Sequence, residues 1–397
     1  MLNRSRPATA AVRAALDQDP AHGAIVPPLV LSSNFSFAGF GQPRKYDYTR
    51  SGNPTRDALA DALSELEGGA GAVITGTGMA AVTLVLNLVP EGGHVVAPHD
   101  CYGGTWRLLD TLSARGRFKL TLVDQTNLPA QREALTAGAD LLWIETPSNP
   151  LLRITDLRAA AEIGHAAGAL VLADNTFLSP LWQQPFSLGA DFVLHSTTKY
   201  LNGHSDVVGG AVIARDAAHV ETLKWWGNTL GLTGAPFDSY LTLRGVRTLS
   251  ARLRVHEENA LRVAELLALH PAVERVYFPG LKDHAGHELA KAQQRSFGAM
   301  LSFEVRGGEP CVRAILQGLQ HYSLAESLGG VESLIAHPAT MTHASMSPAA
   351  RAFAGIKDNL LRVSVGIEDG DDLVADLRAG LDRASAVRVR PSLGLAA

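Results

Sequence analysis

The stretch Ser196-Thr197-Thr198-Lys199-Tyr200 closes an apolar run and opens a glycine-containing loop. A second apolar run, upstream, ends in the acid Asp174. Burial lowers the proton affinity of a lysine, so that its amine can form an imine with a carbonyl compound. A strand-end lysine among hydroxyl groups and a strand-end acid suit a cofactor that needs an imine, a phosphate seat and a cationic ring nitrogen. These residues predict pyridoxal phosphate (PLP).

The bulk composition limits the class of protein. The chain has 397 residues, of which 46% are hydrophobic and 19% charged, so a large buried core and about two domains are expected. A formal net charge of −4 argues against a nucleic-acid partner. With two cysteines, Cys101 and Cys311, no disulfide framework is implied, and a reducing cytoplasm is expected.

One uncharged segment, residues 68–90, is long enough to cross a bilayer. It contains five glycines and has no flanking basic anchor, so we interpret it as a buried strand followed by a buried helix and expect no membrane partner. The N-terminal residues lack the apolar core of a secretory signal.

The order of apolar and amphipathic segments predicts an α/β protein. Seven short apolar runs alternate with helical patterns over residues 70–215, which is typical of a mostly parallel sheet covered on both faces. We expect an extended N-terminal arm over residues 1–62, a cofactor-binding α/β domain over 63–255 and a smaller α+β domain over 256–397. The long helical stretch 239–270 should join the two, with Arg252, Arg254, Glu257 and Glu258 on a solvated face.

Each chemical interpretation has a structural alternative. A lone lysine after hydroxyl residues is more often a surface residue, and Asp174 could instead cap a turn with Asn175. The context of Lys199, with the polar loop 202–206 directly behind it, favours the chemical role.

The segment Gly76-Thr77-Gly78-Met79-Ala80-Ala81 fits a G-x-G-x-x-A pattern. It could open a nicotinamide-binding unit with Asp100 on the ribose, which would make the protein a dehydrogenase. Under either interpretation a helix N-terminus with free N–H groups faces a phosphate.

Two further residues stand out by their surroundings. Tyr102 follows a strand end beside two glycines, where its ring could stack on a cofactor or simply lie half-buried. Arg362 interrupts an apolar strand, where a cation is costly unless it is paired. A substrate carboxylate would supply the partner, as would an internal salt bridge to Glu368 or Asp369. The scattered histidines, including His284 and His287, predict no metal site.

Five motifs together resemble the γ-subfamily of fold-type I PLP-dependent enzymes of transsulfuration, over almost the full chain. They are Asp47-Tyr48-Thr49-Arg50-Ser51-Gly52-Asn53-Pro54-Thr55, Glu145-Thr146-Pro147-Ser148-Asn149-Pro150, Asp174-Asn175-Thr176, Ser196-Thr197-Thr198-Lys199-Tyr200-Leu201-Asn202-Gly203-His204, and Ala325-Glu326-Ser327-Leu328-Gly329-Gly330-Val331-Glu332-Ser333. The resemblance implies the fold-type I transferase fold and a homotetramer built from active dimers.

The resemblance also assigns the cofactor contacts. Lys199 would bind PLP covalently, Asp174 would pair with its ring nitrogen and Tyr102 would stack on the ring. The phosphate would be bound by Gly78, Met79, Ser196 and Thr198, and by Tyr48 and Arg50 from a neighbouring subunit.

The implied substrates are small amino acids. Asn149, Ser327 and Arg362 would hold a cofactor oxygen and the substrate carboxylate, while Glu326 would lie near the distal end. Lys199 and Asp174 would be catalytic, together with Tyr102 and Tyr48.

The implied reaction is a γ-replacement in which cysteine displaces succinate from O-succinylhomoserine to give cystathionine. Ser51 departs from relatives that carry a second arginine there, although Arg107 remains available for a distal carboxylate. Cleavage of cystathionine, or replacement by sulfide, therefore stays open, as does a non-catalytic binding role.

Overall fold

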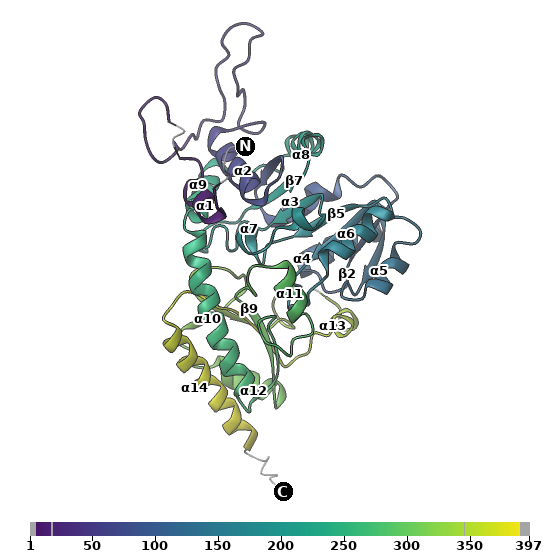
Figure 1. The fold of residues 1–397 in the computed structure, drawn as a ribbon, viewed down its shortest axis with the longest axis vertical. Coiled ribbons are helices and arrows are strands. Elements are labelled where there is room, and N and C mark those ends of the chain that lie inside the picture. Colours follow the sequence, from purple (N-terminus) through teal and green to yellow (C-terminus); the bar gives the residue numbers. More distant parts are fainter. Residues whose placement is uncertain (1–4, 17–18, 345, 390–397) are drawn as a thin grey trace, which may run out of the picture.

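The computed structural model describes residues 5–16, 19–344 and 346–389, which form two sheet-containing regions joined by a long helix (Figure 1). The helices are α1 (Pro7–Val12), α2 (Pro54–Glu67), α3 (Gly78–Leu86), α4 (Gly103–Ala114), α5 (Leu128–Ala134), α6 (Leu157–Ala166), α7 (Ser179–Trp182), α8 (Ala217–Leu230), α9 (Pro236–Val246), α10 (Leu249–Leu269), α11 (His287–Gln293), α12 (Gly308–Leu316), α13 (Pro348–Ala354) and α14 (Gly370–Val389), with a 3₁₀ turn at Pro185–Leu188. The strands are β1 (Gly71–Thr75), β2 (Gly93–Pro98), β3 (Phe118–Val123), β4 (Leu141–Glu145), β5 (Leu170–Asp174), β6 (Phe192–His195), β7 (Gly210–Ala214), β8 (Val273–Tyr277), β9 (Met300–Val305), β10 (Tyr322–Leu324), β11 (Ser333–Ala336) and β12 (Leu360–Ser364).

The larger sheet has seven strands in the order β1-β7-β6-β5-β4-β2-β3. Strands β6, β5, β4, β2 and β3 run parallel, whereas β7 is antiparallel to both of its neighbours. Along β4, Leu141 and Trp143 pack into one buried cluster, and Leu142 and Ile144 pack into another. The sheet is therefore buried on both faces, and the predicted mostly parallel α/β fold is confirmed.

The first helix of this region begins and ends where its sequence requires. The Asn53 side chain accepts N–H groups of Thr55 and Arg56, Pro54 occupies the first turn, and Gly68 ends the helix with φ 81°. An N-cap of this kind stabilises a helix by about 1 kcal/mol. Helix α2 thereby starts at Pro54.

The second sheet has five strands in the order β10-β11-β12-β9-β8, with only the β10–β11 pair parallel. The sequence analysis missed β10 and β11, because both are short and the segment before β11 contains Gly329 and Gly330. Strand β11 pairs with β12 and strand β10 pairs with β11, and local pattern does not reveal these contacts between segments.

The predicted helical stretch 239–270 is two helices, since the chain breaks between α9 and α10. The prediction that Arg252 is solvated was wrong: it is 5% exposed and donates to the carbonyls of Tyr200 (2.9 Å) and Gly245 (2.8 Å). Its guanidinium therefore donates to buried backbone oxygens, one of them in the residue that follows Lys199. Arg254 and Glu258 are exposed, as expected.

Residues 19–53 form loops that extend away from the two sheets (Figure 1). Ile25 is 62% exposed and Phe40 is fully exposed, so this arm buries little of its own apolar surface. The proposed arm boundary at 62/63 lies within α2, and the proposed boundary at 255/256 lies within α10; both remain predictions.

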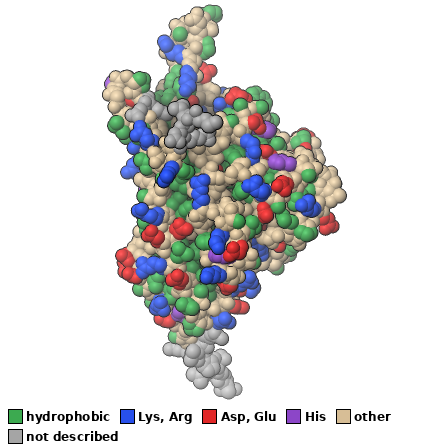
Figure 2. Space-filling model, in the orientation of Figure 1, with side chains coloured by type: hydrophobic (Ala, Val, Ile, Leu, Met, Phe, Trp, Pro, Cys, Tyr) green, Lys and Arg blue, Asp and Glu red, His purple; other side chains and the backbone are tan. Residues whose placement is uncertain are grey.

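Figure 2 shows acidic and basic side chains intermixed on the face in view, without a broad basic field. Within the described residues, no helix is long and apolar enough to cross a membrane.

Candidate active site

A cavity of about 390 Å³ opens at the carboxyl ends of the parallel strands, where open α/β sheets bind ligands. Strand ends and loops of the larger sheet form one wall, and the segment before β11 together with β12 forms the other. Most of the predicted site residues line it, namely Gly78, Met79, Tyr102, Asn149, Asp174, Ser196, Thr198, Lys199, Glu326, Ser327 and Arg362.

Lys199 lies in the turn that follows β6. Its Nζ atom donates to Oγ of Ser327 at 2.7 Å. Burial, with the charge of Arg362 as the second cause, lowers the pKa of Lys199 to about 8, while Glu326 acts in the opposite direction. An amine with this pKa is partly neutral near physiological pH, which imine chemistry requires.

Asp174 ends β5, and the backbone N–H of Thr176 donates to its Oδ1 at 3.0 Å. Burial raises the pKa of Asp174, while Thr176 and the charge of His195 act against that rise. A cation placed beside this carboxyl would relieve the cost of its burial. A pyridinium nitrogen is such a cation.

The N-terminus of α3 forms a cradle with the turn after β6. Thr77 is the N-cap, and its side chain accepts the N–H of Ala80 at 2.9 Å. A Cβ on Gly78 would lie 3.0 Å from Oγ of Ser196, so glycine allows the two segments to approach closely. The free N–H groups of the first helical turn and the nearby hydroxyls of Ser196 and Thr198 suit a phosphate.

Arg362 is 2% exposed and has no acidic partner among the described residues. Its Nη1 donates to Oδ1 of Asn149 (2.9 Å) and its Nη2 donates to the carbonyl of Ser327 (2.8 Å), while its buried Nε has no partner. The alternative of an internal salt bridge is not found, because Glu368 bonds to Ser333 instead. A buried guanidinium with an unused donor is stabilised by an anionic partner, and a substrate carboxylate would supply one.

Asn149 also contacts His343, in the C-terminal region. The His343 ring contacts its carbonyl at 3.1 Å, and Thr342, which lines the cavity, contacts the other ring nitrogen at 2.9 Å. Burial lowers the pKa of His343 to about 3, so the ring is neutral at physiological pH. The sequence analysis missed His343, since nothing in its local sequence indicates this contact.

Three predicted residues do not line the cavity of this chain: Tyr48, Arg50 and Arg107. Arg107 is exposed on α4. Tyr48 is 49% exposed on the arm, and Arg50 donates to the backbone and side-chain oxygens of Asn228 at 2.8 and 2.9 Å. Arg50 lines a separate cleft of about 670 Å³ between the arm and α8.

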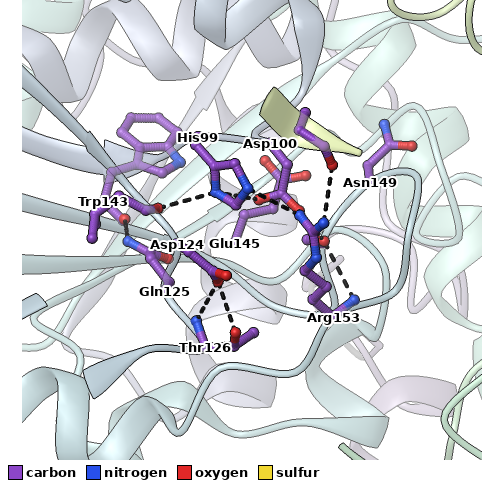
Figure 3. Close-up of polar contacts among 12 residues, drawn as sticks. His99, Asp100, Asp124, Gln125, Thr126, Trp143, Glu145, Asn149 and Arg153 are labelled. Carbon is purple, nitrogen blue, oxygen red and sulfur yellow. Dashed lines mark hydrogen bonds and ion pairs between the residues drawn. The ribbon is translucent and has the colours of Figure 1, made fainter. Parts of the chain in front are cut away.

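A polar cluster of His99, Asp100 and Arg153 lies in the loops that precede Tyr102 and follow Asn149 (Figure 3). Arg153 donates to Asp100 at 2.7 Å and to the carbonyl of Ala354 at 3.0 Å, which ties the larger domain to the C-terminal one. Glu145 lies next to this cluster and accepts the N–H of Tyr102 at 2.9 Å. Glu145 was not predicted as a site residue, although its place at the end of a strand is a usable signal.

The residues of the cavity fit PLP. They supply an amine with a lowered pKa, an acid at a strand end, a phosphate cradle that a larger residue at 78 would fill, and an unpartnered guanidinium. A nicotinamide-binding site would give this lysine no role, so these residues do not favour the dehydrogenase alternative.

Comparison with known proteins agrees with this fit. A family model described as Cys/Met metabolism PLP-dependent enzyme matches residues 8–382. Cystathionine gamma-synthase of Escherichia coli (strain K12) is 54% identical over 379 residues, which is 95% of this chain and 98% of that protein.

Solved structures give the same result. Cystathionine gamma synthase from Xanthomonas oryzae pv. oryzae, solved with cystathionine and with aminoacrylate and cysteine, superposes with a TM-score of 0.96 at 63% identity over 97% of this chain and 100% of that chain. Cystathionine gamma-lyase from Lactobacillus plantarum, complexed with L-serine, has a TM-score of 0.93 at 40% identity over 96% of this chain and 100% of that chain. The family model decides between the two cofactors in favour of PLP. The chain belongs to the Cys/Met metabolism PLP-dependent enzyme family.

Proposed function

We propose that this enzyme catalyses a γ-replacement in which the thiol of L-cysteine displaces succinate from Cγ of O-succinylhomoserine and forms cystathionine. The observation that carries the proposal is the juxtaposition of Lys199, Asp174 and Arg362 in one cavity. The names of the E. coli and Xanthomonas relatives, and the cystathionine bound to the latter, support this reaction.

The cofactor would be held at both of its ends. Asp174 would face the ring nitrogen, Tyr102 would stack on the ring, and Gly78, Met79, Ser196 and Thr198 would bind the phosphate. When bound, PLP draws electron density from the substrate, so that protons next to the amino carbon become acidic.

Arg362 would bind the substrate carboxylate with its free Nε, while Asn149 and Ser327 keep the guanidinium in place. Lys199, released when substrate binds, would carry protons from the α carbon and then from the β carbon. Its pKa of about 8 suits both removal and return of a proton. Tyr102 or Tyr48 would assist in deprotonating the incoming thiol, and Glu326 would lie near the distal end of the substrate.

We also propose that the arm serves a second copy of the chain in a homotetramer built from active dimers. Its apolar side chains are exposed, and Tyr48 and Arg50 do not reach the cavity of their own chain. In a neighbouring subunit these two residues would contact the phosphate, and Arg107 would be available for a distal carboxylate. Free buried thiols at Cys101 and Cys311 support a cytoplasmic location.

The second candidate function is cystathionine cleavage, which the name of the 40% identical Lactobacillus relative favours. Products would be measured with O-succinylhomoserine plus cysteine, with O-succinylhomoserine plus sulfide, with the acetyl ester plus cysteine, and with cystathionine alone. We expect cystathionine from the first mixture to form fastest. Slow synthesis together with fast cleavage of cystathionine would overturn the proposal.

A further inference from the structure

Glu145 and Asp174 form a pair of acids at the carboxyl edge of the sheet. They are direct partners in the parallel pairing of β4 with β5, so their side chains lie on the same face as neighbours. Both residues line the cavity, and Glu145 is only 6% exposed. Asp174 is half-buried, and two carboxyl groups that are adjacent at such a site cannot both carry a charge without a cost.

The acids in this region differ in their partners. Asp100, a third acid near the pair, forms an ion pair with Arg153 at 2.7 Å. Asp174 receives the N–H of Thr176 and would face the ring cation of the cofactor. Glu145 has no ion pair within the described ranges. Its carboxyl accepts the N–H of Tyr102 at 2.9 Å and also a backbone hydrogen bond from Asn149. Burial and the neighbouring Asp174 raise the pKa of Glu145 well above its usual value.

The hydrogen bond from the Tyr102 N–H to Glu145 lies next to a close contact between the Tyr102 ring and Gly104. Tyr102 is the N-cap residue of α4, and its side chain makes no cap hydrogen bond. Its ring lies over the start of that helix, since a Cβ on Gly104 would lie 2.6 Å from Cε1 of Tyr102 and 3.0 Å from Sδ of Met79. A shift of the Tyr102 backbone would therefore move the ring that is proposed to stack on the cofactor.

We propose that Glu145 is a positioning residue that works as an uncharged carboxyl: it holds the backbone of Tyr102 so that the ring covers the cofactor, and it leaves Asp174 as the ionised member of the pair. This inference rests on the proposed cofactor roles of Tyr102 and Asp174. It assigns the two strand-end acids different protonation states, because one faces a cation and the other faces only amide donors.

The test compares Glu145→Ala with Glu145→Gln in the PLP-loaded protein, without substrate. The readouts are the dissociation constant of PLP and the visible circular dichroism of the bound cofactor, which reports the chiral surroundings of its ring. We expect Ala to weaken PLP binding about ten-fold or more and to alter the dichroic band, because the acceptor for the Tyr102 N–H is lost. Gln keeps an uncharged acceptor of the same size, and should recover both quantities to within about three-fold.

Asp100→Asn is the matched control, since it neutralises an acid that has an arginine partner. Asp100→Asn should weaken PLP binding more than Glu145→Gln does, because it leaves the Arg153 charge uncompensated. The proposal is overturned if Gln is as damaging as Ala, which would mean that charge is needed, or if Ala changes neither readout. If Ala does not fold, the contrast between Glu145→Gln and Asp100→Asn decides. A failure of the proposed reaction would leave these substrate-free readouts unaffected, so the two claims can be separated.

Discussion

The Nζ atom of Lys199 lies 2.7 Å from Oγ of Ser327, across the boundary between the two sheets. Ser327 has φ 80°, a backbone conformation that is uncommon for a residue with a side chain, and its carbonyl accepts the guanidinium of Arg362. One strained residue therefore contacts both the amine and the proposed carboxylate-binding cation. Strain of this kind persists where the surrounding structure enforces it, often at functional sites.

The first prediction concerns this contact. Ser327→Ala removes the hydroxyl that holds the Lys199 amine, and hydrogen bonds to charged groups are worth about 1.5–3 kcal/mol, so kcat/KM should fall about ten-fold or more. Steady-state kinetics of cystathionine formation measures this. Ser323→Ala, an exposed serine of β10, is the control and should have no effect. A change of less than about two-fold in Ser327→Ala would show that the contact is dispensable.

The second prediction concerns pH. Burial lowers the pKa of Lys199 from 10.5 to about 8, so the folded protein favours the neutral amine. Only the neutral amine attacks an aldehyde, and the rate at which cofactor-free protein takes up PLP should therefore rise with pH, with a midpoint near 8, and level off above it. Stopped-flow absorbance between pH 6 and 10 records this. A midpoint above pH 10 would mean that Lys199 is solvated like an ordinary lysine.

The third prediction concerns Arg362. Lysine keeps the charge but cannot donate at once to Asn149, to Ser327 and to a carboxylate in the fixed geometry of a guanidinium. Arg362→Lys should raise the KM for the amino-acid ester about 100-fold, by the loss of the charge-assisted contact from Nε, while the spectrum of bound PLP is retained. Arg378→Lys, an exposed arginine of α14, is the control. An unchanged KM would place the carboxylate elsewhere.

The fourth prediction concerns acid stability. Burial lowers the pKa of His343 to about 3 and that of His256 to about 4, both from 6.5. Groups whose pKa is lower in the folded state contribute stability that is present above pH 6.5 and is lost as the pH falls toward these values, because the unfolded chain takes up the protons. The free energy of unfolding in urea should decrease from pH 6.5 to 5, and less steeply in His256→Gln. A flat profile over this window would contradict the burial of neutral rings.

The parts of the site that could be predicted from the sequence are those at strand ends. Lys199 and Asp174 each follow an apolar run, and parallel strands bring their carboxyl ends to one edge, so local pattern was enough to bring them together. Arg362 was also recognised from its strand, because a cation in an apolar run has to be explained by a partner.

The parts that could not be predicted depend on contacts between segments distant in sequence. Arg252 looked like one charge on a solvated helix face, and its burial results from the approach of the turn after Lys199 to α9 and α10. Strand β11 is short and is recognisable only from its pairing with β12 and β10. For Tyr48 and Arg50 the resemblance implied a site in another subunit, which the fold of one chain does not test.

The central claim is that Lys199 carries the cofactor, and borohydride reduction followed by peptide mass mapping tests it most directly. Lys199 is the lysine that lines the cavity in the described part of the chain. The reduced pyridoxyl group should be found on the peptide that contains Lys199, and Lys199→Ala should fold but yield no labelled peptide. A label on another lysine, or no label on a protein that turns over substrate, would contradict the account.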